Sequence, residues 1–177
     1  MKKIIYSILF LIVNFCFSQT IKDCEGFIDW RYNKNIEVFS DSEGKQILNK
    51  IKNDNKNENY LFFKIIETNN KFIKVEIGLG LSDKINYIIG WIKKEKYVVT
   101  VGRIYSETSN PINLYSEPNI NSKITCTLTY SITPEPYLTI LDCSNGWLYV
   151  KYTKKNKIYE GWINPYDHCA NPYTTCG

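Results

Sequence analysis

His168 and Cys169 are the residues whose types could support covalent catalysis, because a cysteine hydrolase needs a thiolate with an imidazole within reach. His168 is the single histidine of the chain. Neighbouring residues of a strand point to opposite faces, however, so the two side chains are not expected to meet. The sequence has no Gly-x-Ser-x-Gly elbow, phosphate-binding loop or His-Glu-x-x-His motif. We predict a protein that is not an enzyme and carries no cofactor; carboxylate pairs for sugar hydrolysis stay open.

The chain begins with the features of a secretory signal peptide. A basic start, Met1–Lys3, precedes an apolar run from Ile4 to Val13 and a small residue at Ser18. The run is shorter than the roughly 20 residues that a membrane-spanning helix needs. We expect residues 1–18 to be cleaved and the mature protein to be secreted or periplasmic, touching the membrane only through the signal peptide before cleavage. An N-terminal membrane anchor and a lipid anchor on Cys16 are the alternatives.

Five cysteines follow the signal peptide, and export would allow them to form disulfides; they are Cys24, Cys126, Cys143, Cys169 and Cys176. The segments Ser122 to Leu128 and Tyr137 to Cys143 resemble the arms of a hairpin around the turn from Thr133 to Pro136. Symmetric pairing about that turn would place Cys126 opposite Cys143, at a separation that suits a disulfide. We therefore expect a bridge between these two residues.

The second expected bridge joins Cys169 to Cys176 across an Asn-Pro turn. The alternative ties Cys143 to Cys169 or to Cys176, which would hold the C-terminal tail on the second domain. With the two local bridges Cys24 is left over, and it could form a dimer with a second copy of the chain. Zinc sites favour cysteines separated by two to four residues. The chain has no such pair, so we expect no metal.

The charge of the chain is nearly balanced, with 22 Lys and Arg against 18 Asp and Glu. Proteins that bind nucleic acids usually concentrate their basic residues on one face, so we expect no nucleic-acid partner. Two lysine-rich clusters, Lys93–Lys96 and Lys154–Lys157, lie beside expected strand ends. Such clusters are typical of solvated turns.

The domain organisation can be predicted from a sequence pattern that occurs twice in the same order. Its three parts are Ile36–Asp41 with Ile112–Glu117, Phe72–Ile77 with Trp147–Tyr152, and Gly90–Ile92 with Gly161–Ile163. A period of about 70 residues is longer than that of solenoid repeats and predicts two small domains in tandem. We expect the first at residues 19–101 and the second at 102–177.

Strand signals dominate the mature chain. Segments rich in β-branched and aromatic residues alternate with short turn clusters, which favours antiparallel hairpins over helical crossovers. In Phe72–Ile77 we expect Ile73, Val75 and Ile77 to share one face and point into the core; in Trp147–Tyr152 the same holds for Leu148 and Val150. No amphipathic helix of ten residues is evident. The expected fold class is all-β.

Once the repeats are aligned, the chain resembles tandem bacterial Src-homology-3-like (SH3-like) domains. The resemblance is carried by Ile112–Pro118, Asn145–Val150 and the closing Gly161–Ile163, and it covers about residues 30–168. The first copy is divergent, since it lacks the proline and has longer hairpins. The resemblance implies two small, partly open β-barrels. It also implies a non-catalytic module that attaches an exported protein to cell-wall peptides or other ligands.

Four residues are candidates for a ligand-binding groove in the second domain: Tyr115, Glu117, Trp147 and Tyr166. In an SH3-like barrel these regions lie near one side, where they could bind a peptide, a peptidoglycan fragment or an envelope protein. Packing in the core or at its rim is the alternative for Trp147, and also for Tyr115 and Tyr166. Two other functions stay open: a structural or assembly subunit of an envelope complex, and an accessory to a cell-wall hydrolase.

Overall fold

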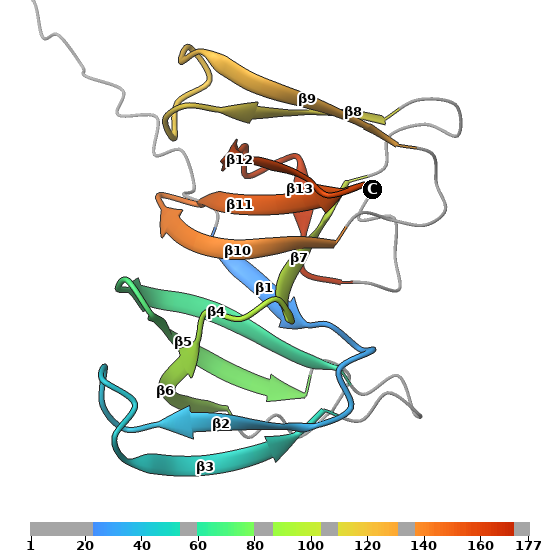
Figure 1. The fold of residues 1–177 in the computed structure, drawn as a ribbon. Helices are drawn as coiled ribbons and strands as arrows, with labels where there is room; N and C mark the ends of the chain where they lie inside the picture. The colour runs from blue at the N-terminus through green and yellow to red at the C-terminus, as the bar shows by residue number, and fades with distance from the viewer. Residues whose placement is uncertain (1–22, 54–59, 80–86, 104–109, 131–136, 172–177) are drawn as a thin grey trace, which may run out of the picture.

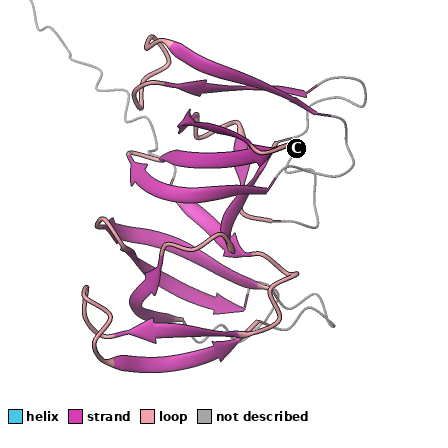
Figure 2. Ribbon diagram, viewed as in Figure 1, coloured by secondary structure: helices cyan, strands magenta, loops and turns pink. Residues whose placement is uncertain are grey.

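The computed structural model describes residues 23–53, 60–79, 87–103, 110–130 and 137–171. These residues form one antiparallel sheet of 13 strands that does not close on itself, and none of them is helical (Figures 1 and 2). The all-β prediction is confirmed. The predicted signal peptide lies outside the described residues.

The strands are short, mostly five to eight residues. They are β1 (Glu25–Ile28), β2 (Asn35–Phe39), β3 (Ile47–Lys52), β4 (Leu61–Thr68), β5 (Phe72–Leu79), β6 (Ile88–Lys93), β7 (Val98–Gly102), β8 (Asn110–Tyr115), β9 (Ile124–Tyr130), β10 (Tyr137–Ser144), β11 (Trp147–Lys154), β12 (Lys157–Ile163) and β13 (His168–Cys169).

The strand order repeats within the sheet. Its first part runs β3-β2-β6-β5-β4-β1 and its second part, read from the other edge, runs β9-β8-β12-β11-β10-β7. We call β1–β6 the first half and β8–β12 the second half. Figure 1 shows β2–β6 in the lower part of the view and β8–β12 in the upper part, with β1 and β7 between them. Two successive stretches of chain thus follow the same path.

Irregularities in the pairing repeat as well. The register of β4 and β5 shifts between Ile65 and Glu67, and the register of β10 and β11 shifts between Ile140 and Asp142. A bulge is a local feature that a strand pair does not need in order to form. Its occurrence at matching places therefore supports the duplication that the sequence predicts.

The two Gly-Trp-Ile segments meet equivalent neighbours. A Cβ atom on Gly90 would lie 2.8 Å from the carbonyl oxygen of Phe39, and one on Gly161 would lie 3.0 Å from that of Tyr115. The following residues, Trp91 and Trp162, pair with these same two aromatic residues in β2 and β8. Glycine allows β6 to approach β2 in the first half and β12 to approach β8 in the second half.

Strand β7 belongs to both repeats. Its Val99 pairs with Phe27 of β1 and its Val101 pairs with Tyr137 of β10, while β13 pairs with the same strand through Cys169 and Val101. Strand β13 thus pairs with β7 in the same antiparallel way as β7 pairs with β1. The predicted boundary after residue 101 thus falls inside a strand that both halves use, and the division into two domains stays a prediction.

The expected hairpin between Ser122–Leu128 and Tyr137–Cys143 is wrong. Strand β9 pairs with β8, so that Cys126 lies opposite Leu114, whereas β10 pairs with β11 and β7. Symmetry about a turn assumes that arms adjacent in sequence pair with each other. The repeated topology overrides it, because β8 pairs with β9 as β2 pairs with β3 in the first half. The turn itself, 133–136, lies outside the described residues.

The disulfide between Cys126 and Cys143, which was predicted from this hairpin, is wrong as well. Cys143 is bonded to Cys24, not to Cys126, and Cys126 is a free thiol. Cys24 is therefore not left over for a dimer with a second copy. Cys169 is disulfide-bonded, and Cys176 lies outside the described residues.

The core follows the period of two that strands impose. As predicted, Ile73, Val75 and Ile77 of β5 and Leu148 and Val150 of β11 are buried. Their cluster continues without a break from the first half through Val98 of β7 into the second half. Burial across the junction joins the halves in addition to the disulfide.

Candidate functional site

The four candidate residues of the second half lie at the expected strand ends, but they differ in exposure. Tyr115 ends β8 and is only 5 % exposed; its ring meets that of Trp147 edge to face, with centroids 5.5 Å apart. Tyr166 is 64 % exposed in the connection between β12 and β13. Glu117 is exposed in the turn after β8. The structure joins Tyr115 to Trp147, while Glu117 and Tyr166 lie in separate turns.

His168 and Cys169 do not form a nucleophile and base. His168 is 1 % exposed, and its Nε2 atom lies 3.2 Å from the carbonyl oxygen of Gly146. Cys169 is disulfide-bonded, so its sulfur is not a thiolate. The pair forms β13 on the edge of β7, which is a structural position.

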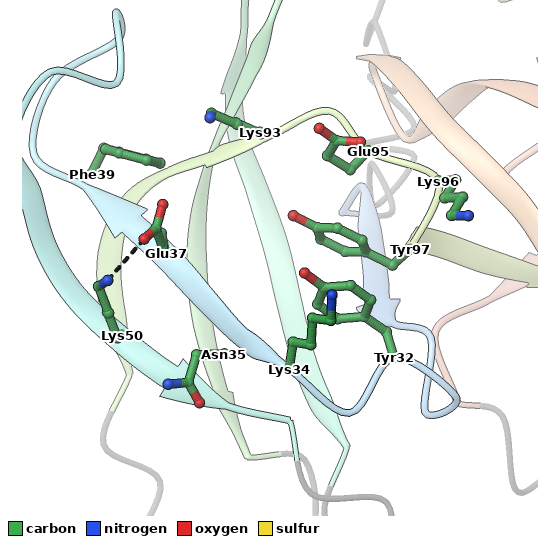
Figure 3. A pocket seen from close by; sticks show the side chains of 10 residues that line it. All are labelled: Tyr32, Lys34, Asn35, Glu37, Phe39, Lys50, Lys93, Glu95, Lys96 and Tyr97. Atoms are coloured by element: carbon green, nitrogen blue, oxygen red, sulfur yellow. Dashed lines mark ion pairs between the residues drawn. The ribbon is translucent and has the colours of Figure 1, made fainter.

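A cavity of about 490 Å³ lies in the first half, where the sequence indicated no site. We call it the tyrosine groove (Figure 3); it is lined by Tyr32, Lys34, Asn35, Glu37, Phe39, Lys50, Lys93, Glu95, Lys96 and Tyr97. These residues come from β2, β3 and the end of β6, and from the connections that precede β2 and β7. The volume is in the range of ordinary ligand sites.

Two stacked rings form one wall of the groove. The centroids of Tyr32 and Tyr97 are 3.9 Å apart and their planes differ by 21°. In Figure 3 the two hydroxyl groups point the same way, along the groove. Burial raises the pKa of the Tyr97 hydroxyl, and the Tyr32 hydroxyl and Glu95 raise it further. Tyr97 is therefore a neutral phenol at physiological pH, able to donate as well as accept a hydrogen bond.

The stack is positioned by hydrogen bonds between chain segments. The backbone N–H of Asp29 donates to the carbonyl oxygen of Tyr97 at 2.8 Å. The side chain of Asn53, which is 1 % exposed, donates to the carbonyl oxygens of Asp29 and Tyr32, both at 2.9 Å. Asn53 also accepts from the N–H of Leu61 at 3.3 Å. A single buried amide thus fixes the segment that carries Tyr32.

Charged groups form the rest of the wall. Lys50 and Glu37 form an ion pair of 2.9 Å across β2 and β3, and the ammonium group of Lys93 lies 5.8 Å from the centre of the Phe39 ring. Among the described residues, neither Lys34 nor Lys96 has a carboxylate within 4.0 Å. The groove combines apolar ring surface with uncompensated positive charge.

A second cavity, of about 430 Å³, lies where the two halves meet. We call it the junction cavity; it is lined by Lys94, Glu95, Lys96, Tyr137, Thr139, Leu141, Lys151 and Thr153. Tyr137 is held from the first half, since its hydroxyl accepts from the indole N–H of Trp30 at 2.7 Å and Arg31 stacks over its ring at 4.5 Å. Glu95 and Lys96 line both cavities.

A third depression, of about 590 Å³, lies between two turns of the first half. Its walls are exposed turn residues such as Ser42, Lys45 and Asn70. The carboxylate of Asp41 shapes one of these turns by accepting from backbone N–H groups, including that of Gln46 at 2.8 Å. Without a ring pair in its wall, this depression offers less apolar surface than the tyrosine groove.

The tyrosine groove lies where the repeat places the groove expected in the second half. Phe39 corresponds to Tyr115, and Lys96 to Tyr166, by the register of the strands that flank them. The contact that holds Tyr97 is repeated too, since the N–H of Arg103 donates to the carbonyl oxygen of Asp167 at 2.8 Å. The tyrosine groove and the groove predicted in the second half thus occupy corresponding places in the two halves, and a binding site at Tyr115, Glu117, Trp147 and Tyr166 stays a prediction.

Comparison with known protein families matches no family, and comparison with characterised protein sequences finds no significant match. In the part of the chain that the structure describes, no helix has the length and apolarity to cross a membrane. No group of three or more His, Cys, Asp or Glu side chains within the described ranges could hold a metal ion. The tyrosine groove offers aromatic rings, lysines, two carboxylates, an amide and the neutral hydroxyl group of Tyr97.

Proposed function

We propose that this protein is an exported, non-catalytic binding module built from two SH3-like units, and that the tyrosine groove is its binding site. The ligand is a cell-wall or envelope component: a peptide, a peptidoglycan fragment or a segment of an envelope protein. The observation that carries the proposal is the stack of Tyr32 and Tyr97 in the wall of a cavity of ligand size.

The structure supports recognition more than chemistry at this site. The groove offers ring surface and ammonium groups, which bind a ligand without reacting with it. Rings fixed by a buried amide lose little conformational freedom on binding, so more of the contact energy contributes to affinity. A pre-formed groove is what a binding module needs.

Export rests on the predicted signal peptide, and the intrachain disulfide between Cys24 and Cys143 is compatible with it. Disulfides persist in oxidising compartments and are rare in the cytosol. A secreted or periplasmic location therefore fits both features. The alternative of an assembly subunit dimerised through Cys24 loses its basis, because that sulfur is bonded within the chain.

Binding of the mature chain, residues 19–177, to isolated cell-wall material tests the proposal. Tyr32→Ala removes one ring of the stack and should reduce the bound fraction at least tenfold. Tyr166→Ala removes an exposed ring in the second half and serves as the matched control. Equal loss in both variants, or loss only with Tyr166→Ala, would move the site out of the tyrosine groove. Circular dichroism should show that both variants are folded.

A further inference from the structure

The tyrosine groove and the junction cavity share a wall. Glu95 and Lys96 of the connection between β6 and β7 line both of them. A ligand that fills both must pass over this connection. A compact ion or a single sugar is too small to do so, whereas an extended chain is suited to it.

The lining of the two cavities is strongly basic. It contains six lysines and two acids: Lys34, Lys50, Lys93, Lys94, Lys96, Lys151, Glu37 and Glu95. Lys50 is paired with Glu37, and Lys151 lies 3.9 Å from Glu160. Among the described residues the other four lysines have no carboxylate within 4.0 Å. The surface is therefore complementary to a ligand with several negative charges.

One of these lysines lies partly out of water. Lys94 is half-buried at the junction, and desolvation lowers the pKa of its ammonium group, against the opposing charge of Asp142. An ion pair formed at such a place is screened less than one on the open surface. A carboxylate in the junction cavity would thus gain more than one bound to Lys34.

The placement of the cations indicates which kind of anion fits. An ammonium group is a point charge that pairs with a carboxylate or a phosphate from many directions, whereas the planar fork of arginine binds either anion in a bidentate way. Among the described residues that line the two cavities, the basic ones are all lysines. The lysines are also spread along the path instead of converging on one point. Carboxylates spaced along a chain fit this arrangement better than one phosphate group.

The apolar part of the lining distinguishes a peptide from an acidic glycan. Tyr32, Phe39 and Tyr97 give the groove ring surface, and Leu141 gives the junction cavity an aliphatic side chain. An extended peptide presents alternate side chains to opposite sides, about 3.3 Å apart. Acidic and apolar side chains can then reach lysines and rings in turn, whereas a uronic acid polymer has no apolar side chains to bury.

We infer that the ligand is an acidic peptide segment, mixed with apolar residues, that lies extended across the tyrosine groove and the junction cavity over Lys96. The inference rests on the proposed function and specifies its ligand. The peptide can be free, or it can be an exposed segment of an envelope protein, since both present the same chemistry.

Fluorescence anisotropy with synthetic peptides tests the inference. The probe is a labelled peptide of about 12 residues, roughly 40 Å when extended, in which glutamate alternates with leucine. The first comparison probe has glutamine in place of glutamate, and the second is an oligogalacturonate of similar charge. We expect the glutamate peptide to bind at least tenfold more tightly than either. Its affinity should fall as salt rises from about 50 to 500 mM.

Charge reversal locates the contact. Lys96→Glu changes the wall common to both cavities and should weaken binding of the glutamate peptide about tenfold. Lys123→Glu reverses an exposed lysine in the turn before β9 and should leave the affinity unchanged. Equal effects of the two variants would show that only net charge matters and would overturn the inference.

The outcomes separate this inference from the function on which it rests. Tighter binding of the oligogalacturonate, or equal binding of the glutamine peptide, overturns the acidic-peptide ligand. Binding to cell-wall material that still depends on Tyr32 would leave the proposed function in place. If Tyr32→Ala affects neither the cell-wall material nor any probe, both proposals fail.

Discussion

The sulfur atoms of Cys24 and Cys143 are bonded to each other across 119 positions of sequence, with their Cα atoms 6.2 Å apart. Cys24 precedes β1 of the first half, and Cys143 lies near the end of β10 in the second half. The bond therefore closes a loop that contains the whole first half, β7 to β9 and most of β10. It adds a covalent link to the strand pairing at β7 and to the shared core that join the halves.

Removal of this bridge should cost much of the stability. For Cys24→Ser combined with Cys143→Ser we expect the free energy of unfolding to fall by about 2–5 kcal/mol, because a long loop is freed in the unfolded chain. Urea denaturation followed by Trp fluorescence measures it. The double variant avoids exchange with the free thiol of Cys126. A change below about 0.5 kcal/mol would contradict the bridge as a staple between the halves.

Thiol counting offers a separate check of the cysteine assignment. Cys126 is half-buried on β9, and burial raises the pKa of its thiol. Because the thiolate is the form that reacts, iodoacetamide should label this residue slowly near neutral pH and faster as the pH rises. Peptide mapping should find Cys126 labelled and Cys24 and Cys143 unlabelled. Label on Cys24 in the native protein would contradict the structure.

A change at Asn53 should disturb the groove and the fold together. Asn53→Ala leaves the carbonyl oxygens of Asp29 and Tyr32 without the amide that serves them. We expect a loss of about 2–4 kcal/mol in the free energy of unfolding. Asn53→Asp should be at least as damaging, because a carboxylate cannot donate to these two carbonyl groups. Chemical denaturation of both variants, against Asn49→Ala on exposed β3, measures the difference.

The closing glycines give a paired test of the duplication. A Cβ on Gly90 would lie 2.4 Å from a side-chain carbon of Val38, and one on Gly161 would lie 2.9 Å from the Cβ of Leu114. Both Gly90→Ala and Gly161→Ala should destabilise by about 1–3 kcal/mol, since the opening strand has to shift. Ile89→Ala on the exposed face of β6 is the control. Tolerance of alanine at one glycine only would show that the halves close differently.

Alkaline pH should weaken the fold through Tyr97. Burial raises the pKa of its hydroxyl in the folded protein above its value in the unfolded chain. The folded state then holds the proton more tightly, so this contribution to stability is complete below about pH 10 and is lost as the pH rises further. Urea denaturation at a series of alkaline pH values measures this loss. Tyr97→Phe should lose less stability than the wild type over that range; an identical decline in both would argue against a buried hydroxyl.

Much of the fold is predictable from the sequence because it depends on local patterns. The alternation of Ile73, Val75 and Ile77, and the glycine before each closing tryptophan, are short-range signals that strands and close contacts impose. Recognising the second copy then gives the pairing of one half from the other. The SH3-like assignment itself stays a prediction.

The cysteine pairing and the tyrosine groove could not be predicted from local patterns, and the physical reason is the same for both. The symmetric hairpin that placed Cys126 against Cys143 used only local sequence, whereas the actual partner of Cys143 depends on where the halves meet. The stack of Tyr32 and Tyr97 likewise needs two connections that are distant in the chain. The lysine-rich cluster 93–96 lies at a strand end, as predicted, since Lys93 ends β6. It is not simply a solvated turn, because Lys94 is half-buried and the connection to β7 is a wall between two cavities.

Sharing of β7 has a consequence for how such a chain could grow or be cut. An additional copy could use the last strand of the preceding copy as its own first strand. The chain could therefore gain a repeat without a new linker. Conversely, cleavage of the chain between the two halves would leave one fragment without β7 and would expose an unpaired β-sheet edge.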